Sequence, residues 1–438
     1  MIGMEAVERL AGILERRNVE WEIYWEEGKG VSFRIERERI ERAQWKFYSG
    51  IGLRVGLNGK VGFSYLTGLE HDEESLLGLV KRAEKLARIG SRPFKGFPAR
   101  GKFPRVEGLY DGAIDALDFD GARALAGEFV EKMRELKGNK EEYTLAGAVS
   151  FGTSRAGIAN SNGVEGEEPR TGLAMWAYAV KKNGRSGSGY ASQSYTTLEG
   201  VKEGEELIRK AMREADSSQR AEKIGGFTGE VLLEPQVVEA LVYLFLENLY
   251  GDSVYYSRSR FSIGDLGKKV LSENISIIDD STLEFSPGSY SFDGEGVPGR
   301  RKELISRGEL RSFILDHTYG RLLGLESTGN AVRDFRSVPR IGTGNVLVEE
   351  GGENLGDWSG VVVSKVFGEH TANPVTGDFS LTVELGYVVK NGEVRPFSGN
   401  MISGNVFEAL GKVSRVGKEA ERRGSFYSPR VVTELRLV

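Results

Sequence analysis

The sequence predicts an α+β fold in which helices and antiparallel hairpins occupy separate stretches of the chain. Asn-Gly pairs recur between runs of alternating apolar and polar residues, a pattern typical of β-hairpins. Helical periodicity is confined to a few segments and does not alternate with every strand, which argues against a doubly wound parallel sheet. Glycine is abundant, at 59 of 438 residues against 11 prolines, and indicates many turns and bulges.

We expect an N-terminal α/β domain over residues 1–224, built from antiparallel hairpins and amphipathic helices. Apolar residues at helical spacing predict helices over 4–17, 73–88, 120–137 and about 199–214. Alternation predicts strands over 21–25 and 31–35, hairpins at Asn58-Gly59, Asn162-Gly163 and Asn183-Gly184, and strands throughout 143–198. Residues 216–220 are polar and without apolar periodicity, so we expect them to link two domains.

We expect a β-rich C-terminal domain over residues 225–438 with one buried helix. A strand is predicted over 229–233, and Pro235 suits the first turn of the helix that follows. Residues 237–246 are apolar nearly all round, which predicts a helix inside the core. Short strands and turns follow, with a last hairpin at Asn391-Gly392.

Composition excludes several classes of protein. The chain has no cysteine, which excludes disulfide frameworks, thiol nucleophiles and cysteine-ligated metals. A net charge of −5 argues against sequence-independent nucleic-acid binding. The first residues carry early acids and no apolar core, and no apolar run approaches the roughly 18 residues of a membrane span. We therefore expect a cytoplasmic protein that binds neither nucleic acid nor membrane.

One polar segment, residues 370–380, concentrates side chains that bind main-chain groups or water around a proline and a glycine. Its candidate substrate-contact residues are His370, Thr371, Asn373, Thr376 and Asp378. The functional interpretation is a cleft loop that holds an extended peptide or a water molecule. The alternative is a rigid turn whose side chains bond its own backbone, as Asn and Asp often do.

A second candidate is the pair Asp293 and Glu295, two residues apart between glycines. The two carboxylates could share a cation or act as an acid/base pair. The alternative is a solvated turn, neutralised by the basic residues 300–302. We expect His71 and His317 to be packed or surface histidines. Three scattered histidines without cysteine predict no intrinsic zinc site.

Several phrases, in order along nearly the whole chain, resemble the TldD/PmbA family and, within it, the TldE (PmbA) branch. They lie at residues 161–166, 170–172, 251–254, 292–298, 327–331, 370–378 and 402–405. The resemblance implies a heterodimeric zinc metalloprotease of TldD and TldE chains that degrades unfolded or flexible peptides. It also implies that the TldD chain carries the zinc, on a His-Glu-x-x-x-His helix and a distal cysteine.

Aligning Gly251-Asp252 with the same dipeptide of TldD places Val242 and Glu247 where the zinc histidines would stand. Tyr243 falls at the position of the catalytic glutamate. Valine cannot bind zinc, and a phenol with a pKa near 10 is a poor base for water. The resemblance therefore implies a subunit without catalytic or metal-binding residues, with zinc in its TldD-like partner.

The first hypothesis is thus a non-metal subunit that shapes the cleft or holds the peptide, paired with a TldD-like subunit or with itself when alone. Asn330 joins the two polar segments as a candidate contact residue. A second hypothesis is a peptide-binding or scaffold homodimer without a protease role, using exposed strand edges. A third is an independent hydrolase that uses Asp293, Glu295 and His370 with a borrowed metal, which requires these residues to lie together.

Overall fold

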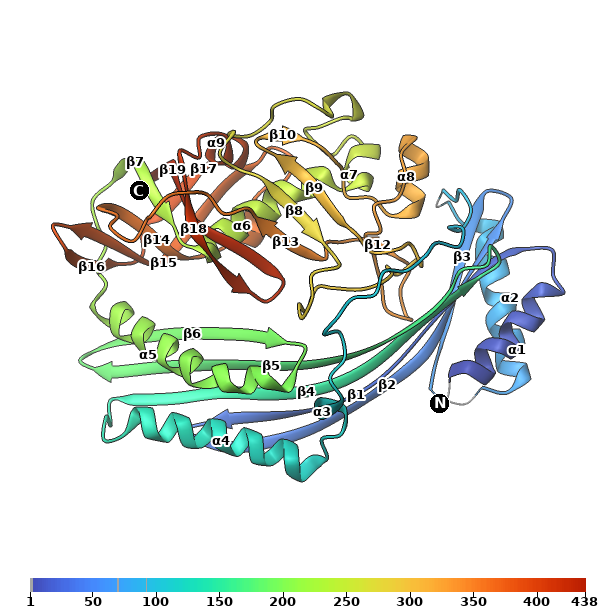
Figure 1. The fold of residues 1–438 in the computed structure, drawn as a ribbon, viewed down its shortest axis with the longest axis horizontal. Coiled ribbons are helices and arrows are strands. Elements are labelled where there is room, and N and C mark those ends of the chain that lie inside the picture. Colours follow the sequence, from blue (N-terminus) through green and yellow to red (C-terminus); the bar gives the residue numbers. More distant parts are fainter. Residues whose placement is uncertain (1–2, 69–70, 92) are drawn as a thin grey trace.

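The computed structural model describes residues 3–68, 71–91 and 93–438, and it confirms the α+β fold. The chain forms two large sheets, one from each half of the sequence (Figure 1). A short extended connection, residues 221–226, joins them. No helix in these described ranges is long and apolar enough to cross a membrane.

The first sheet is antiparallel and has six strands in the order β3-β2-β1-β4-β5-β6. Its strands are β1 (Glu20–Glu36), β2 (Arg39–Leu57), β3 (Lys60–Thr67), β4 (Tyr143–Asn160), β5 (Glu165–Asn183) and β6 (Arg185–Tyr195). The predicted strands 21–25 and 31–35 are one strand, because the glycines between them continue the ladder with both neighbours. Asn58, Asn162 and Asn183 lie at hairpin turns, as predicted.

Helices pack against this sheet in two groups, one toward each end (Figure 1). The helices are α1 (Gly3–Glu15), α2 (Glu73–Ile89), α3 (Gly112–Asp115), α4 (Phe119–Lys137) and α5 (Gly204–Arg220), with a 3-10 turn, η1 (Leu198–Glu203). α1 and α2 cover one apolar cluster, which includes Trp21, Ile23 and Trp25 of β1. α4 and α5 cover a second, which includes Val31 and Phe33 further along the same strand face.

The prediction of a linker over residues 216–220 is wrong, because these residues form the last turn of α5. Asp216 accepts hydrogen bonds from the hydroxyl of Tyr143 and from Lys181, the latter at 2.6 Å. These bonds attach the polar helix end to the first sheet. Apolar periodicity misses this turn because polar contacts hold it in place.

The second sheet has eleven strands and encloses the larger apolar core. They are β7 (Phe227–Leu233), β8 (Ile277–Asp280), β9 (Arg301–Ser306), β10 (Glu309–Leu310), β13 (Asn345–Val348), β14 (Gly360–Phe367), β15 (Asp378–Lys390), β16 (Glu393–Phe397), β17 (Met401–Asn405), β18 (Arg415–Arg423) and β19 (Phe426–Leu437). β7 pairs with β14 on one side and with β19 on the other, so five strands close into a ring. A separate two-stranded ladder joins β11 (Ala331–Val332) and β12 (Arg340–Ile341).

Helix α6 (Pro235–Leu246) is the buried helix that the sequence predicts. Its side chains at Val238, Leu241, Val242 and Phe245 are completely buried in the core of the second half. The remaining short elements surround that core. They are η2 (Glu247–Leu249), α7 (Gly251–Tyr255), η3 (Ile263–Asp265), α8 (His317–Leu323), η4 (Glu369–Thr371) and α9 (Val406–Gly411).

The two halves meet at a buried ion network, which we call the junction network: Glu22, Arg54, Glu295 and Arg333. Arg54 donates two hydrogen bonds to the Glu22 carboxylate, at 2.7 and 2.6 Å, and a third to Glu295 at 2.9 Å. Arg333 donates to Glu22 at 2.5 Å. All four side chains are at most 6% exposed. Strands β1 and β2 are thus tied to two segments of the second half.

We expect Arg54→Met to lower the free energy of unfolding by about 3–5 kcal/mol, because it leaves Glu295 buried without a cation. Guanidinium chloride unfolding followed by circular dichroism measures the loss. Lys202→Met, in the exposed pair of Lys202 with Glu199, is the control and should change stability by no more than about 0.5 kcal/mol. Equal, small effects of the two substitutions would contradict a role for the network in stability.

Candidate functional site

The positions aligned with the zinc motif lie on the second half of α6 and just after it. Val242 is completely buried among apolar side chains. Tyr243 packs its ring 5.7 Å from that of Phe426, and burial raises the pKa of its hydroxyl. Glu247 opens η2, where burial and the nearby Asp252 raise the pKa of its carboxyl group. These three positions carry an alkyl group, a phenol and a carboxyl group.

Among the described residues no three or more His, Cys, Asp or Glu side chains are grouped so that they could hold a metal ion. His71 precedes Asp72, the N-cap of α2, and His317 is the first residue of α8. His370 lies on η4, with its ring edge-on to Phe367 at 6.0 Å. The three histidines therefore belong to three separate elements.

The predicted polar loop connects β14 to β15, and its side chains mainly bond its own backbone. Thr371 donates to the carbonyl of Gly368 at 2.7 Å. Asn373 accepts from the N–H groups of Val375 and Thr376 at 3.0 and 3.3 Å. The Thr376 hydroxyl accepts from the Asp378 N–H at 3.4 Å. This hydrogen-bond pattern is the one expected for a rigid turn whose side chains bond its own backbone.

The same loop is attached to the end of α6. Asn248, which follows the aligned Glu247, donates to the carbonyl of Pro374 at 2.7 Å. On the opposite side of the loop, Asn405 donates to Thr376 and Asp378 at 2.7 and 3.0 Å. The structure therefore places the exposed His370 loop next to the segment that the family alignment singles out.

Asp293 and Glu295 do not form a solvated turn, because both are buried, at 3% and 1% exposure. Asp293 accepts three backbone hydrogen bonds of 2.9 Å, from Glu295, Val297 and Ala331. Burial and the Glu295 carboxylate nevertheless raise the pKa of Asp293 to about 7. Glu295 is neutralised by Arg54 from the first half, and not by the adjacent basic residues 300–302. The expectation of a solvated turn failed because that cation is 241 positions away.

Asn330 is completely buried and has a supporting role. Its amide donates to Asp279 and to the carbonyl of Gly342, at 2.6 and 2.8 Å, while its oxygen accepts from Thr328 at 2.8 Å. Lys302 pairs with the same Asp279 at 2.9 Å. Asn330 therefore completes a buried polar cluster and is not exposed to a substrate.

The structure does not bring together the residues of the independent-hydrolase hypothesis. Asp293 and Glu295 lie inside the junction between the halves, and Glu295 also accepts from the backbone N–H of His317 at 2.8 Å. His370 lies on the exposed loop. No hydrogen bond or ion pair within the described chain joins His370 to either carboxylate.

A large polar cleft of about 970 Å³ separates part of the first sheet from the second half. β6 and α5 form one wall, and the start of α6 with β14, β15 and β18 forms the other. Positively and negatively charged side chains line the cleft, together with several tyrosines. The Oε1 atom of Gln236 is buried in this region and has no hydrogen-bond partner among the described residues. Sequence reasoning missed this cleft, because its walls come from distant segments.

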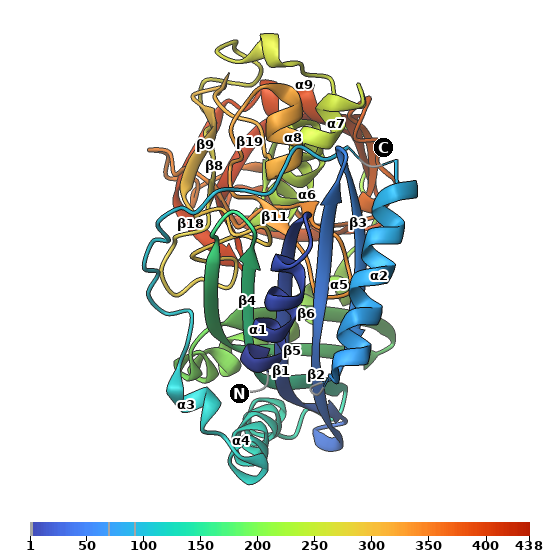
Figure 2. The ribbon, with the colours of Figure 1, turned by 90° about the vertical axis from the view of Figure 1, so that its right-hand side faces the viewer.

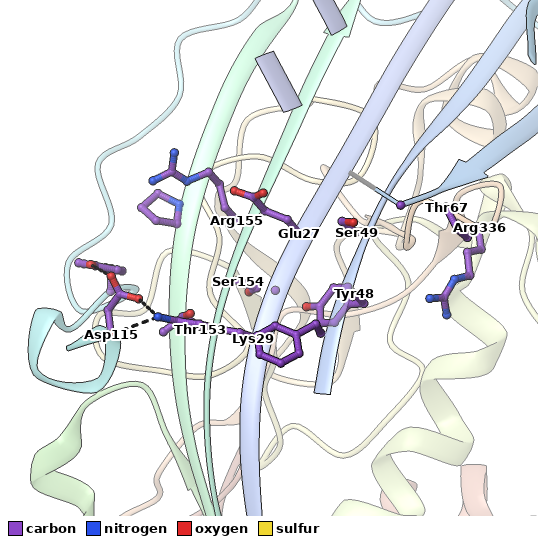
Figure 3. Close-up of a pocket in the computed structure, with 15 residues that line it drawn as sticks. Glu27, Lys29, Tyr48, Ser49, Thr67, Asp115, Thr153, Ser154, Arg155 and Arg336 are labelled. Atoms are coloured by element: carbon purple, nitrogen blue, oxygen red, sulfur yellow. Dashed lines mark hydrogen bonds and ion pairs between the residues drawn. The ribbon is translucent and has the colours of Figure 1, made fainter. Parts of the chain in front are cut away.

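A second cavity, of about 770 Å³, lies on the first sheet, where residues of β1, β2 and β4 line it (Figure 3). Lys29 of β1 reaches toward Asp115, with 3.4 Å between the charged atoms. Phe47 and Tyr48 of β2 line the cavity beside it. Phe47 is 74% exposed, the most of any large apolar side chain described.

Family models match three consecutive parts of this chain. The PmbA/TldA metallopeptidase domain 1 matches residues 21–87, the central domain matches 113–219, and the C-terminal domain matches 227–436. An uncharacterized protein of Methanocaldococcus jannaschii is 30% identical over 97% of this chain and 98% of its own length. A metalloprotease TldD homolog of Buchnera aphidicola is 26% identical, over 91% and 85%.

Two solved structures share the fold over 99% of this chain and all of their own. One is a putative modulator of DNA gyrase from Thermotoga maritima, with a TM-score of 0.88 and 24% identity. The other is TldE from Thermococcus kodakarensis, with a TM-score of 0.86 and 22% identity. The two-sheet fold and the three matched domains define a protein of the metallopeptidase-like class. The chain belongs to the PmbA/TldD family.

One further carboxyl group adjoins the junction network. Asp316 caps α8 by accepting from the N–H of Tyr319 at 2.7 Å. Burial, with the Glu295 carboxylate, raises the pKa of Asp316 to about 8. An unfolded chain releases this proton near pH 4, whereas the folded chain keeps it until about pH 8. Between these values the folded state binds more protons, so this group makes stability fall as pH rises.

We therefore expect Asp316→Asn to gain stability relative to the unmodified chain as pH rises from 5 to 8, by at least about 1 kcal/mol, roughly one pKa unit. The amide oxygen keeps the cap but does not titrate. Urea unfolding at both pH values measures the difference. The control is Asp72→Asn, at an exposed cap whose hydrogen bond to Ser75 lowers the pKa, so this carboxyl group is ionised in the folded and in the unfolded chain from pH 5 to 8 and the effect of its substitution should not change with pH. A difference that does not depend on pH would contradict the raised pKa of Asp316.

Proposed function

We propose that this chain is the non-catalytic, TldE-like subunit of a zinc peptidase that acts on unfolded or flexible peptides. The observation that carries the proposal is the burial of α6 at the positions where the TldD chain has its zinc motif. Val242 is part of the apolar core there, so a ligand at this position would have to displace packed side chains. The zinc would be held by a TldD-like partner.

The neighbouring positions support the same role. Zinc sites are formed by imidazole, thiolate or carboxylate ligands, and a catalytic site keeps one position for water. Of the three aligned residues only Glu247 offers such a ligand. A hydroxyl group whose pKa is raised by burial, as at Tyr243, is deprotonated even less at neutral pH than that of an exposed tyrosine, so less of it is available to act as a base. The chemistry of hydrolysis would therefore belong to the partner.

We propose that this subunit contributes by holding the peptide in the polar cleft. Peptides present both N–H donors and C=O acceptors, and the cleft offers partners for each. The lining includes Arg213 and Arg422 as donors, and Glu234 and Glu384 as acceptors. Arg422 stacks 4.7 Å above the ring of Tyr195, forming a flat surface for side chains. The His370 loop, beside the end of α6, would face the partner.

The test is a mixing assay with a sibling that carries the His-Glu-x-x-x-His helix, using an unfolded polypeptide as substrate. We expect no hydrolysis by this chain alone and no stoichiometric zinc after dialysis, as measured by elemental analysis. Adding the sibling should give cleavage that a chelator abolishes. Hydrolysis by the isolated chain that survives the chelator would exclude the proposed role.

Peptide holding makes a separate prediction at Arg422, which lines the cleft. Arg422→Met should raise the KM of the mixed enzyme about tenfold, since losing one hydrogen bond to a charged group costs about 1.5 kcal/mol, and should leave kcat unchanged. Steady-state kinetics measures both. Arg395→Met is the matched control, because Arg395 lies on β16 outside the cleft and pairs with Glu393. An equal KM for the two variants would move peptide binding away from this cleft.

A further inference from the structure

A third cavity, of about 480 Å³, lies between the first sheet and the second half. Figure 1 and Figure 2 both show α4 on one side of this sheet and the second half on the other. Ser286 and Ser289 line the cavity from the second half. We call it the glycine groove, after Gly30, Gly152 and Gly172, which line it from the sheet.

The three glycines form one row across the floor of the groove. Gly30 of β1 is paired with Gly152 of β4, and Gly152 is paired with Gly172 of β5. Phe151 and Leu173, next to them in sequence, pack in the cluster that α4 and α5 cover, so the glycines face the other side. A Cβ atom at Gly152 or Gly172 would meet no other atom closer than 3.4 Å. The packing of the chain therefore leaves room above the row, where another backbone can approach closely.

At one end of the row stands a hydroxyl group without a partner. Thr196 follows Tyr195, which is paired with Leu173, so it lies beside Gly172. Its side chain lines the groove and is 6% exposed, and its Oγ1 atom has no hydrogen-bond partner among the described residues. A rotation about χ1 exchanges the hydroxyl and methyl positions, so the hydroxyl can turn toward a bound molecule. Since buried polar groups are normally hydrogen-bonded, this one indicates a polar ligand.

The charge of the groove has one sign. Three cations line it, and none of the described lining residues is Asp or Glu. Two of the cations are already paired with carboxylates outside the lining, Lys29 with Asp115 and Arg170 with Glu168. The third, Lys46 of β2, is exposed, and its ammonium group has no hydrogen bond or ion pair in the part of the chain that the structure describes. It is paired across the strands with the glycine of β1, at the opposite end of the row from the free hydroxyl.

We propose that the glycine groove holds the last residues of a peptide, with the C-terminal carboxylate at Lys46. The row crosses β2, β1, β4 and β5 to the end of β6, and neighbouring strands are about 4.8 Å apart, so it is about 19 Å long. An extended peptide of about six residues has this length. The site accepts many sequences, because glycines contact a main chain and do not select side chains.

The inference rests on the proposed function in one respect, that this chain holds peptides. Tyr195 lines both the polar cleft and the glycine groove. One extended peptide can therefore run from the cleft, past this ring, into the groove. The groove adds a preference that the cleft lacks, since carboxylates and cations both line the cleft.

The hydroxyl groups of the lining favour a peptide carboxylate over a phosphate group. They come from Ser150, Ser154, Ser194 and Thr196. A hydroxyl both donates and accepts hydrogen bonds, which suits the alternating N–H and C=O groups of a peptide. Phosphate is typically bound by converging backbone N–H groups, as at a helix N-terminus. The floor of this groove is formed by paired strands.

The first experiment measures binding of a labelled, unfolded peptide with uncharged side chains to the isolated full chain, by fluorescence anisotropy. The peptide is used with a free C-terminal carboxylate and as its C-terminal amide. We expect the free acid to bind about fivefold more tightly, as for a partly exposed ion pair. Lys46→Met should remove this difference without weakening binding of the amide. Lys182→Met, at an exposed lysine of β5 outside the groove, is the matched control and should keep the difference.

Equal affinities of the unmodified chain for the two peptides would overturn the inference and leave the holding of peptides in the cleft intact. Binding of neither peptide would contradict both. A fivefold difference that survives Lys46→Met would place the carboxylate elsewhere and would also overturn the inference.

The second experiment tests the floor of the groove. Gly172→Val should weaken binding of both peptides at least tenfold, because its side chain fills the space above the row. The fold should be kept, since a Cβ atom there meets only the Tyr195 carbonyl oxygen, at 4.0 Å. Ser186→Val, at an exposed position of β6, is the matched control and should bind like the unmodified chain. Equal binding by the two variants would overturn the inference.

The third experiment separates a ligand role of the Thr196 hydroxyl from a structural one. Thr196→Val should weaken binding of both peptides about fivefold, as expected for one lost hydrogen bond. It should not destabilise the chain in urea unfolding, because the hydroxyl has no partner in the free protein. Lower stability with unchanged peptide binding would show that the hydroxyl serves the fold, and would contradict its role in the groove.

Discussion

The structure depends on the neutralisation of charges buried between its two halves. Glu22 and Arg54 belong to the first sheet, whereas Glu295 and Arg333 belong to the second half. Ions without water are tolerated only when paired and hydrogen-bonded. Each half therefore supplies charged side chains that neutralise buried charges of the other half. The relative position of the two halves is fixed by hydrogen bonds with definite geometry. The polar cleft keeps its shape for the same reason.

The chain belongs to a family of metallopeptidases, and the packing of its helix α6 determines which residues that helix can offer for chemistry. The sequence is related to a metalloprotease TldD homolog over 91% of its length, and α6 is filled with apolar side chains. An apolar α6 stabilises the second half but leaves no room for ligands. In the role that we propose, this chain would contribute a binding surface for the substrate, in the cleft and in the loop beside Asn248.

Much of the fold could be predicted because its signals are local. Asn58, Asn162 and Asn183 mark hairpins, and the apolar sequence after Pro235 predicts the buried helix. The junction network could not be predicted, because its contacts between the two halves join residues 241 and 311 positions apart. A signal was nevertheless present, since Glu22 and Arg54 are charged residues inside strongly apolar strand sequences. Asp293 was misread as solvated because its environment is formed by Ala331 and Val297.

The closed ring of strands bears on the order in which the molecule can be made. β7, which opens the second half, needs β19 as one of its two neighbours, and β19 ends at Leu437. During synthesis the ring must wait until β19 has been translated, while the first sheet can form long before. The apolar side chains of α6 would meanwhile be without their cover. Nascent chains of this protein therefore expose the apolar side chains of α6 for a time, and chaperones would have to protect these side chains.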